Sequence, residues 1–175
     1  MKYNHEVIWN EMLPSLTWSR NWHNKEDNKT LCEYASKIDG GSIIELGSAE
    51  GQSTISMLLS TENSFVEIID PFITTNLLTN LKSLGLNKRV VIIPAKSEEA
   101  RIANIGEVGL LSIDAVHTYE AVRGDLEKYS KTEPKYIILH DTFLDEVYRA
   151  VKEFLEKGTY KEEFVGENIT VLAKL

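Results

Sequence analysis

The segment GLLSIDAVHTYEAVRGDLEKY, residues 109–129, decides the fold that this sequence predicts. It starts with a continuous apolar run that stops at Asp114, and apolar residues then recur at helical spacing from Ala121 onward. A wholly apolar strand followed at once by an amphipathic helix is typical of a parallel sheet that is covered by helices on both faces.

The same pairing of strand and helix recurs on both sides of this segment. Five strands that are each followed by a helix predict an α/β fold with a doubly wound sheet, because such crossovers are right-handed. The expected strands are 42–48, 64–72, 89–96, 108–115 and 135–142, and the expected helices are 51–61, 75–86, 97–106, 118–131 and 145–158.

The carboxyl-terminal residues break this pattern. Residues 160–175 predict two strands around a Gly-Glu-Asn turn in place of a sixth strand and helix. A hairpin reverses the chain direction, so we expect a mostly parallel, seven-stranded Rossmann-like sheet with an antiparallel last strand.

Residues 1–40 are richer in tryptophan, asparagine and charge than the rest. They predict a helical extension packed on the core, and residues 41–175 then form the domain that carries the chemistry. Trp18, Trp22 and His23 would line a pocket for a substrate, or this edge would pack on the sheet or on a second subunit. Aromatic residues are enriched in pockets and interfaces alike. The extension is therefore also where we expect a homodimer contact.

Composition limits the classes of function. The chain has 175 residues, 42% hydrophobic and 26% charged, as expected for one globular domain. Its formal net charge of −8 argues against a nucleic-acid partner, which needs clustered Lys and Arg. No apolar run has the length of a membrane span or a signal-peptide core, so we expect a cytoplasmic protein without a membrane partner. Its one cysteine, Cys32, excludes an internal disulfide.

The ends of the first two strands suggest a ligand site, because doubly wound sheets bind ligands at the carboxyl ends of their strands. After Glu45 the chain turns through Gly47 and Gly51, which allow a close backbone approach to a ligand. The loop lacks the glycine pair of a dinucleotide-binding loop, and Glu45 would suit a ligand with an ammonium group and hydroxyls. Asp70 would accept hydrogen bonds from ribose hydroxyls. Together they favour an adenosyl ligand, although each alone also fits an ordinary turn.

Acids and histidines gather at the ends of the fourth and fifth strands. Asp114 and Asp141 end consecutive strands, and such oxygen ligands on one rim suit a divalent cation such as Mg²⁺. His140 would be a further metal ligand or a base. The alternative is that Asp141 caps the turn that follows it and that His140 packs in the sheet.

The motifs of this chain resemble those of class I S-adenosylmethionine-dependent methyltransferases, closest to the family 24 type. That group includes catechol-type and macrocin-type O-methyltransferases and cephalosporin-hydroxylase-like proteins. The resemblance covers residues 41–175 and rests on the motifs IIELGSAEGQST, EIIDPF, AKSEEA, LLSIDAVHTYEAVRGDLEKY and YIILHDT.

The resemblance implies a role for each matching position. The first loop would surround the methionine part of the cofactor, the acid after the second strand would hold the ribose, and residues after the third strand would lie beside the adenine. The implied cofactor-binding positions are Glu45, Gly47, Ser48, Gly51, Ser53, Asp70, Lys96, Ser97 and Asp114. The implied metal ligands are Asp114, His140 and Asp141.

Two positions depart from the family pattern. The family has D-A-D-H-[ST]-Y-E where this chain has D-A-V-H-T-Y-E, so Val116 replaces an acid that is thought to be the general base of some sugar O-methyltransferases. His140 replaces the first acid of the usual pair. Both changes remove negative charge, so a metal that accepts imidazole, such as Mn²⁺, Fe²⁺ or Zn²⁺, is an alternative to Mg²⁺.

The resemblance implies methyl transfer to a hydroxyl of a small-molecule acceptor, a sugar or a phenol, with a divalent metal (Mg²⁺ or Mn²⁺) polarising the acceptor oxygen. His117 and His140 are the candidate general bases, because imidazole suits proton transfer near neutral pH. His117 would otherwise only cap the helix that follows it. Two alternatives remain open: a metal-independent methyltransferase with a histidine base, and a catalytically degenerate cofactor-binding or interaction module.

Overall fold

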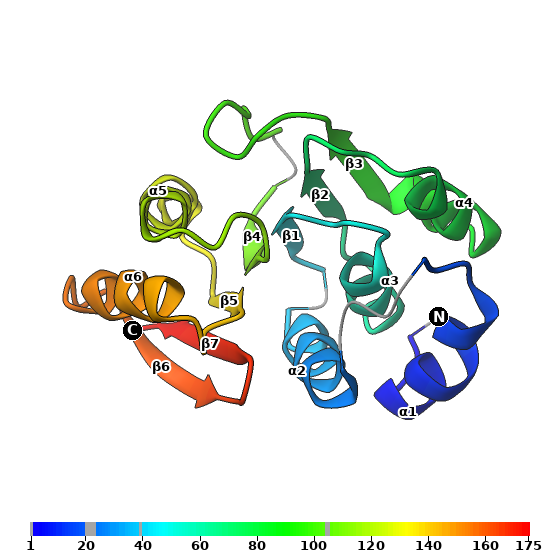
Figure 1. Cartoon of the computed structure of the whole chain (residues 1–175). Coiled ribbons are helices and arrows are strands. Elements are labelled where there is room, and N and C mark those ends of the chain that lie inside the picture. The colour runs from blue at the N-terminus through cyan, green and yellow to red at the C-terminus, as the bar shows by residue number, and fades with distance from the viewer. Residues whose placement is uncertain (1, 20–23, 39, 104–105) are drawn as a thin grey trace.

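A computed structural model describes residues 2–19, 24–38, 40–103 and 106–175. In these residues the chain forms one seven-stranded sheet with the order β3-β2-β1-β4-β5-β7-β6 (Figure 1). The strands are β1 (Ser42–Leu46), β2 (Val66–Ile69), β3 (Val90–Ile93), β4 (Val108–Ile113), β5 (Tyr136–His140), β6 (Tyr160–Val165) and β7 (Ile169–Lys174).

Strands β1 to β5 pair in parallel, and β7 is antiparallel to both of its neighbours, β5 and β6. The expected fold class, a doubly wound sheet with an antiparallel last strand, is therefore confirmed. The strand order reverses between β1 and β4, which is where such sheets open a crevice for ligands.

Helices cover both faces of the sheet (Figure 1). Helices α2 (Lys25–Ser36), α3 (Gln52–Leu59) and α4 (Thr75–Ser83) pack on one face, and α5 (Tyr119–Tyr129) and α6 (Asp145–Leu155) pack on the other. Successive strand residues alternate between the faces, so neighbours such as Ile43 and Ile44 belong to two separate hydrophobic clusters.

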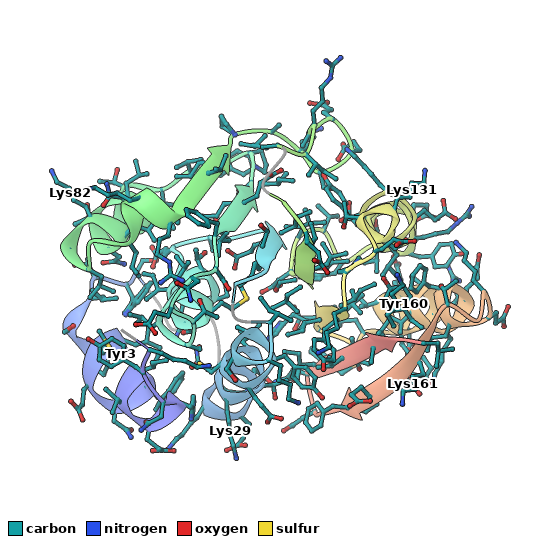
Figure 2. The ribbon with its side chains drawn as sticks, turned by 180° about the vertical axis from the view of Figure 1, so that it is seen from behind. Tyr3, Lys29, Lys82, Lys131, Tyr160 and Lys161 are labelled. Atoms are coloured by element: carbon teal, nitrogen blue, oxygen red, sulfur yellow. The ribbon has the colours of Figure 1, made fainter. Side chains whose placement is uncertain are left out.

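The amino-terminal residues pack against the α2–α4 side. They form a short helix α1 (His5–Val7), a π-helical turn (Ile8–Met12) and a 3₁₀ turn (Leu13–Ser15). Ile8 and Leu13 are buried in the same cluster as Ile43, and Tyr3 N donates to Leu59 O at 2.8 Å. Figure 2, seen from behind, places Tyr3 and Lys29 on this side and Tyr160 on the hairpin side.

The helix expected at residues 97–106 is wrong. Residues 97–99 form a turn, 100–103 have no regular structure, and 104–105 lie outside the described residues. The ammonium group of Lys128 on α5 donates to three carbonyl oxygens of this segment, those of Ser97, Glu98 and Ala100, at 2.5, 3.1 and 2.7 Å. Because a distant side chain satisfies these carbonyls, they do not need the backbone partners that a helix would supply.

None of the described helices is long and apolar enough to cross a bilayer.

Candidate active site

A pocket of about 780 Å³ opens at the carboxyl ends of β1 to β4, beside the point where the strand order reverses. Eight of the residues named from the sequence line it: Gly47, Ser48, Ser53, Asp70, Lys96, Ser97, Asp114 and His117. Lining residues that sequence reasoning did not single out for cofactor contact are Ser19, Ala49, Glu50, Gln52, Ile69, Pro71, Phe72, Thr74, Glu98, Ala115 and Val116.

The loop after β1 packs tightly against the end of β4. Gly47 has φ 82° and Gly51 has φ 88°, and Ala49 between them also has a positive φ of 47°. A Cβ atom on Gly47 would lie 2.0 Å from the carbonyl oxygen of Asp114, so only glycine fits there. This contact brings the loop and the acid of β4 to one pocket.

Asp70 anchors the same loop. Its Oδ2 accepts hydrogen bonds from the backbone N–H groups of Ser48 and Ala49, at 2.8 and 3.1 Å, and its Oδ1 accepts one from Phe72 N at 2.8 Å. A carboxylate offers about four acceptor positions. The Ser48 hydroxyl also donates to Oδ2, at 3.3 Å, so four donors already match the acceptor positions of Asp70. Asp70 therefore holds the loop, and its contact with a ribose hydroxyl stays a prediction.

Glu45 lies beneath the loop and is not among the described residues that line the pocket. It is 1% exposed, and the hydroxyls of Ser53 and Thr54 on α3 donate to its two oxygens. Burial raises the pKa of Glu45 to about 7, and the nearby negative charges of Asp114 and Asp70 act in the same direction. Its contact with the cofactor stays a prediction; its visible role is to hold the start of α3.

Glu50 is a pocket residue that sequence reasoning missed. Its carboxylate is buried at the pocket wall, where Ser19 N donates to Oε2 at 2.7 Å and Asn76 Nδ2 donates to Oε1 at 3.1 Å. The available signal was its place between Ala49 and Gly51 in the loop. Glu50 fastens the amino-terminal segment to the site.

Lys96 and Ser97 line the pocket, and their place beside the adenine stays a prediction. The turn at Ser97 is fixed by Lys128 and by the Tyr129 hydroxyl, which donates to Ser97 O at 2.7 Å. Asp125 lies behind it, and burial raises the pKa of Asp125 to about 6 although a hydrogen bond with Ser97 opposes this. Nothing in the sequence marked Asp125 as a residue beside the Ser97 turn.

His117 lies at the pocket mouth between two carboxylates. Its Nε2 is 3.3 Å from Asp114 Oδ1 and 3.2 Å from Asp141 Oδ2. The hydrogen bond with Asp114 raises the pKa of His117, burial lowers it, and the charges of Asp114 and Asp141 raise it further. The imidazole is thus placed to take up a proton next to the pocket.

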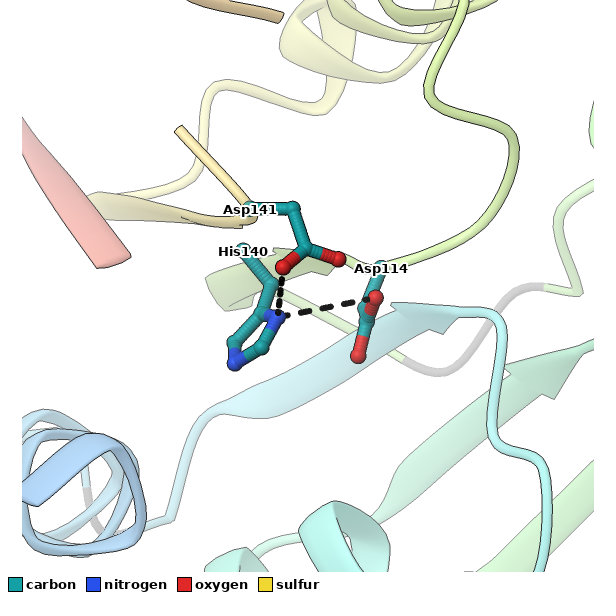
Figure 3. A group of neighbouring side chains, drawn as sticks. All are labelled: Asp114, His140 and Asp141. Atoms are coloured by element: carbon teal, nitrogen blue, oxygen red, sulfur yellow. Dashed lines mark ion pairs between the residues drawn. The ribbon is translucent and has the colours of Figure 1, made fainter. Parts of the chain in front are cut away.

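His140 lies beside the two acids, and one of its ring nitrogens faces both of them (Figure 3). Its Nδ1 is 3.4 Å from Asp141 Oδ1 and 3.9 Å from Asp114 Oδ1, and its Nε2 is 3.2 Å from Asp27 Oδ2. Asp141 adopts a left-handed backbone conformation with φ 54°, which aspartate tolerates better than most residues. Asp114, His140 and Asp141 each offer one ligand atom within 4.8 Å of the others, so the predicted metal ligands come together.

The predicted aromatic wall of the pocket is only partly described. Trp18 is not among the lining residues; its Nε1 donates to Leu13 O at 2.8 Å, and its ring packs against the amino-terminal cluster. The structure shows the packing alternative for Trp18, and a contact of this residue with the acceptor stays a prediction. Trp22 and His23 lie outside the described residues.

Solved structures share this fold at low sequence identity. A Staphylococcus aureus protein described as a caffeoyl-CoA O-methyltransferase aligns with a TM-score of 0.73 at 15% identity, over 99% of this chain and 93% of its own. A Clostridium thermocellum protein described as an rRNA methylase aligns with a TM-score of 0.67 at 16% identity, over 89% and 98%. The SAH-bound Podospora anserina methyltransferase aligns with a TM-score of 0.67 at 12% identity, over 98% and 87%. No curated protein matches the sequence.

A family model described as a methyltransferase domain matches residues 44–142, more than half of the chain. The matched range runs from β1, through the pocket loop, Asp70 and Asp114, to Thr142 after the acid–histidine cluster. The chain therefore belongs to this methyltransferase-domain family, in agreement with its resemblance to class I S-adenosylmethionine-dependent methyltransferases.

Proposed function

We propose that the protein methylates the hydroxyl group of a small phenolic acceptor, with S-adenosylmethionine as the methyl donor. The observation that carries this proposal is the position of His117, which lines the pocket while Asp114 and Asp141 flank its Nε2. An imidazole so placed suits removal of a proton from an acceptor hydroxyl.

The residues of the pocket fit the donor. Its carboxylates at Glu50, Asp70 and Asp114 suit a ligand that carries ammonium and sulfonium charges and ribose hydroxyls. Gly51, the N-cap of α3, gives no side-chain cap, so the first turn of that helix suits the methionine carboxylate. S-adenosylmethionine supplies the methyl group, which passes to the acceptor oxygen as its bond to sulfur breaks, and S-adenosylhomocysteine leaves.

The rim of the pocket favours a phenol over a sugar. Phe72 and Val116 line the pocket and are 79% and 60% exposed. A bound acceptor could therefore bury apolar surface on both side chains. An aromatic ring buries such surface better than a polyhydroxyl compound does. The net charge of −8 disfavours RNA as the acceptor.

His117 is the better base of the two histidines. It lines the pocket, whereas His140 is not among the described lining residues and faces Asp27 and Asp141. The proton taken from the acceptor would reside on His117, where the two flanking carboxylates stabilise the resulting positive charge.

The donor set at Asp114, His140 and Asp141 fits a divalent metal, since two carboxylates and one imidazole are ordinary ligands for it. A metal held there would lower the pKa of the acceptor hydroxyl. The metal-independent alternative is favoured by a different observation: the His117 ring already lies between the same two carboxylates.

The test is a methyl-transfer assay with radiolabelled S-adenosylmethionine against matched panels of phenols, sugars and an rRNA transcript, each with EDTA and with added Mg²⁺ or Mn²⁺. Label in phenols alone supports the proposal. Label in RNA or only in sugars overturns the acceptor class, and activity that survives EDTA in full overturns the metal-assisted form.

A further inference from the structure

Asp27 joins the amino-terminal extension to the acid–histidine cluster. It lies in the first turn of α2, is 3% exposed, and its Oδ2 is 3.2 Å from His140 Nε2, a residue 113 positions away in the chain. This contact was not marked by any sequence motif, and it joins His140 to a segment outside the range that the family model matches.

The partners of Asp27 decide which nitrogen of His140 carries a hydrogen. The same Oδ2 accepts hydrogen bonds from the side-chain amides of Asn24 and Asn168, at 2.7 and 3.1 Å. Oδ2 of Asp27 is therefore an acceptor in both of these hydrogen bonds. His140 Nε2 must then be the donor in its contact with Asp27, because two acceptor atoms at this distance repel each other.

The other nitrogen of the ring then faces the acids. In neutral imidazole with its hydrogen on Nε2, the lone pair is on Nδ1. Nδ1 points toward Asp141 Oδ1 and Asp114 Oδ1, at 3.4 and 3.9 Å (Figure 3). Three acceptor atoms that converge in this way are stabilised by a cation among them. A histidine that binds a metal typically donates its second N–H to a carboxylate, and Asp27 is such a carboxylate.

We propose that Asp27 is a positioning residue that fixes the Nε2–H tautomer of His140, and that it thereby makes the cluster select first-row transition metal ions over Mg²⁺. The proposal rests on the metal-assisted form of the proposed function. Imidazole is a poor ligand for Mg²⁺ and a good one for transition metals, so the orientation of one ring shifts the preference of the whole site. The helix α2 becomes part of the metal centre.

The test measures metal binding and tautomer without any methyl acceptor. Calorimetric titrations at pH 7.5 compare Co²⁺ and Mg²⁺ on the full chain, on Asp27→Asn and on Asn24→Ala. Asn24→Ala is the matched control, since it removes the N-cap of the same helix and a second donor to Asp27 but leaves the carboxylate beside His140. Long-range ¹⁵N–¹H spectra identify the His140 tautomer, and the His140→Gln spectrum assigns its signals.

The expected result is a His140 that carries a hydrogen on Nε2 in the unmodified chain. Asp27→Asn should lower Co²⁺ affinity by about 10- to 100-fold and Mg²⁺ affinity by less than about threefold, while Asn24→Ala changes neither by more than about threefold. A His140 that carries its hydrogen on Nδ1, equal losses for the two metals, or equal losses in the two variants would overturn the proposal. So would a chain that binds no Co²⁺ at millimolar concentration.

If Asp27→Asn does not fold, the tautomer of the unmodified chain still decides the central claim. These readouts do not depend on catalysis. A chain with the expected tautomer and metal preference that methylates no phenol would overturn the proposed function and leave this inference standing.

Discussion

The backbone of Gly47 touches the carbonyl of Asp114 so closely that a Cβ atom at position 47 would come within 2.0 Å of that oxygen. The loop that carries the predicted methionine contacts is therefore in direct backbone contact with the end of the strand that carries Asp114. A larger side chain at position 47 must therefore displace the backbone of Asp114.

Gly47→Ala should destabilise the protein by about 2–3 kcal/mol, because it combines a left-handed backbone with a clash against main-chain atoms. It should also abolish S-adenosylmethionine binding. Gly85→Ala is the control: Gly85 has φ 67° but open space around it, so only the strain of the conformation is added. Urea denaturation and calorimetry measure both effects, and equal losses in the two variants would show that the contact with Asp114 is unimportant.

His117→Gln should lower kcat by about 10²- to 10⁴-fold, the usual range for a lost general base. Affinity for S-adenosylmethionine should change by less than about threefold, because the proposed role concerns the acceptor proton. Glu120→Gln, an exposed change three residues further along, is the control. Single-turnover kinetics at saturating donor separate the two quantities; an unchanged rate of methyl transfer would rule out His117 as the base.

Glu45 should make the protein less stable as the pH rises. Its pKa in the folded state is about 7, above the ordinary value of 4.5, so its stabilising contribution is complete below pH 4.5 and is lost between there and pH 7. The loss amounts to about 3 kcal/mol as an upper estimate. Glu45→Gln should flatten the pH dependence of the free energy of unfolding over this window, measured by urea titration at a series of pH values. Some slope should persist, since Asp125 acts in the same direction up to its pKa of about 6.

Lys128→Met should weaken cofactor binding from a distance. The ammonium group holds three carbonyls of the turn that carries Ser97, and methionine keeps the apolar stem but removes every donor. We expect about a tenfold loss of S-adenosylmethionine affinity and a loss of about 1–3 kcal/mol in stability. Lys131 is an exposed lysine three residues later, and Lys131→Met should change neither the affinity nor the stability. Normal affinity in Lys128→Met would mean that the turn orders itself without this residue.

Val116→Asp restores the acid of the family pattern at a position that is 60% exposed, so stability should change by less than about 0.5 kcal/mol. The added charge on the pocket rim should raise Mg²⁺ affinity about tenfold. It should also reduce the rate with phenols, because the apolar rim is lost. Calorimetry with Mg²⁺ and the labelled-methyl assay check the two halves separately, and Val116→Asn controls for side-chain size. An unchanged phenol rate would show that the rim does not contact the acceptor.

The alternation of apolar strands and helices was sufficient to predict the sheet, its mostly parallel order and the reversed β7, because these depend on local periodicity and turn chemistry. The helix expected at residues 97–106 failed for a non-local reason. Ser97 resembles an N-cap in sequence, but its carbonyl oxygen accepts a hydrogen bond from the ammonium group of Lys128, 31 residues later. The first strand is also shorter than expected, because β1 ends at Leu46, two residues before the expected end.

Site residues could be predicted where they lie in a recognisable motif. They could not be predicted where the fold brings together segments that are distant in the sequence. Asp114, His140 and Asp141 come together as their places at the ends of adjacent strands suggested. Asp27 could not be found in this way, because it reaches His140 across 113 residues. The place of Glu50 in the first loop was a signal for a pocket residue, but its contact with Ser19 was not predictable from that loop.

The attachment of the Ser97 turn to α5 also has a consequence for the order of assembly. The turn lies at residues 97–99, and Lys128, which holds it, is 28 to 31 residues further along the chain. Lys128 reaches its position only when α5 docks on the sheet. The Ser97 side of the pocket should therefore be completed late in folding, after most of the sheet has formed. Pulsed hydrogen exchange during refolding would show β1 and β4 protected before Ala100 and Ala103, and the reverse order would exclude this sequence of events.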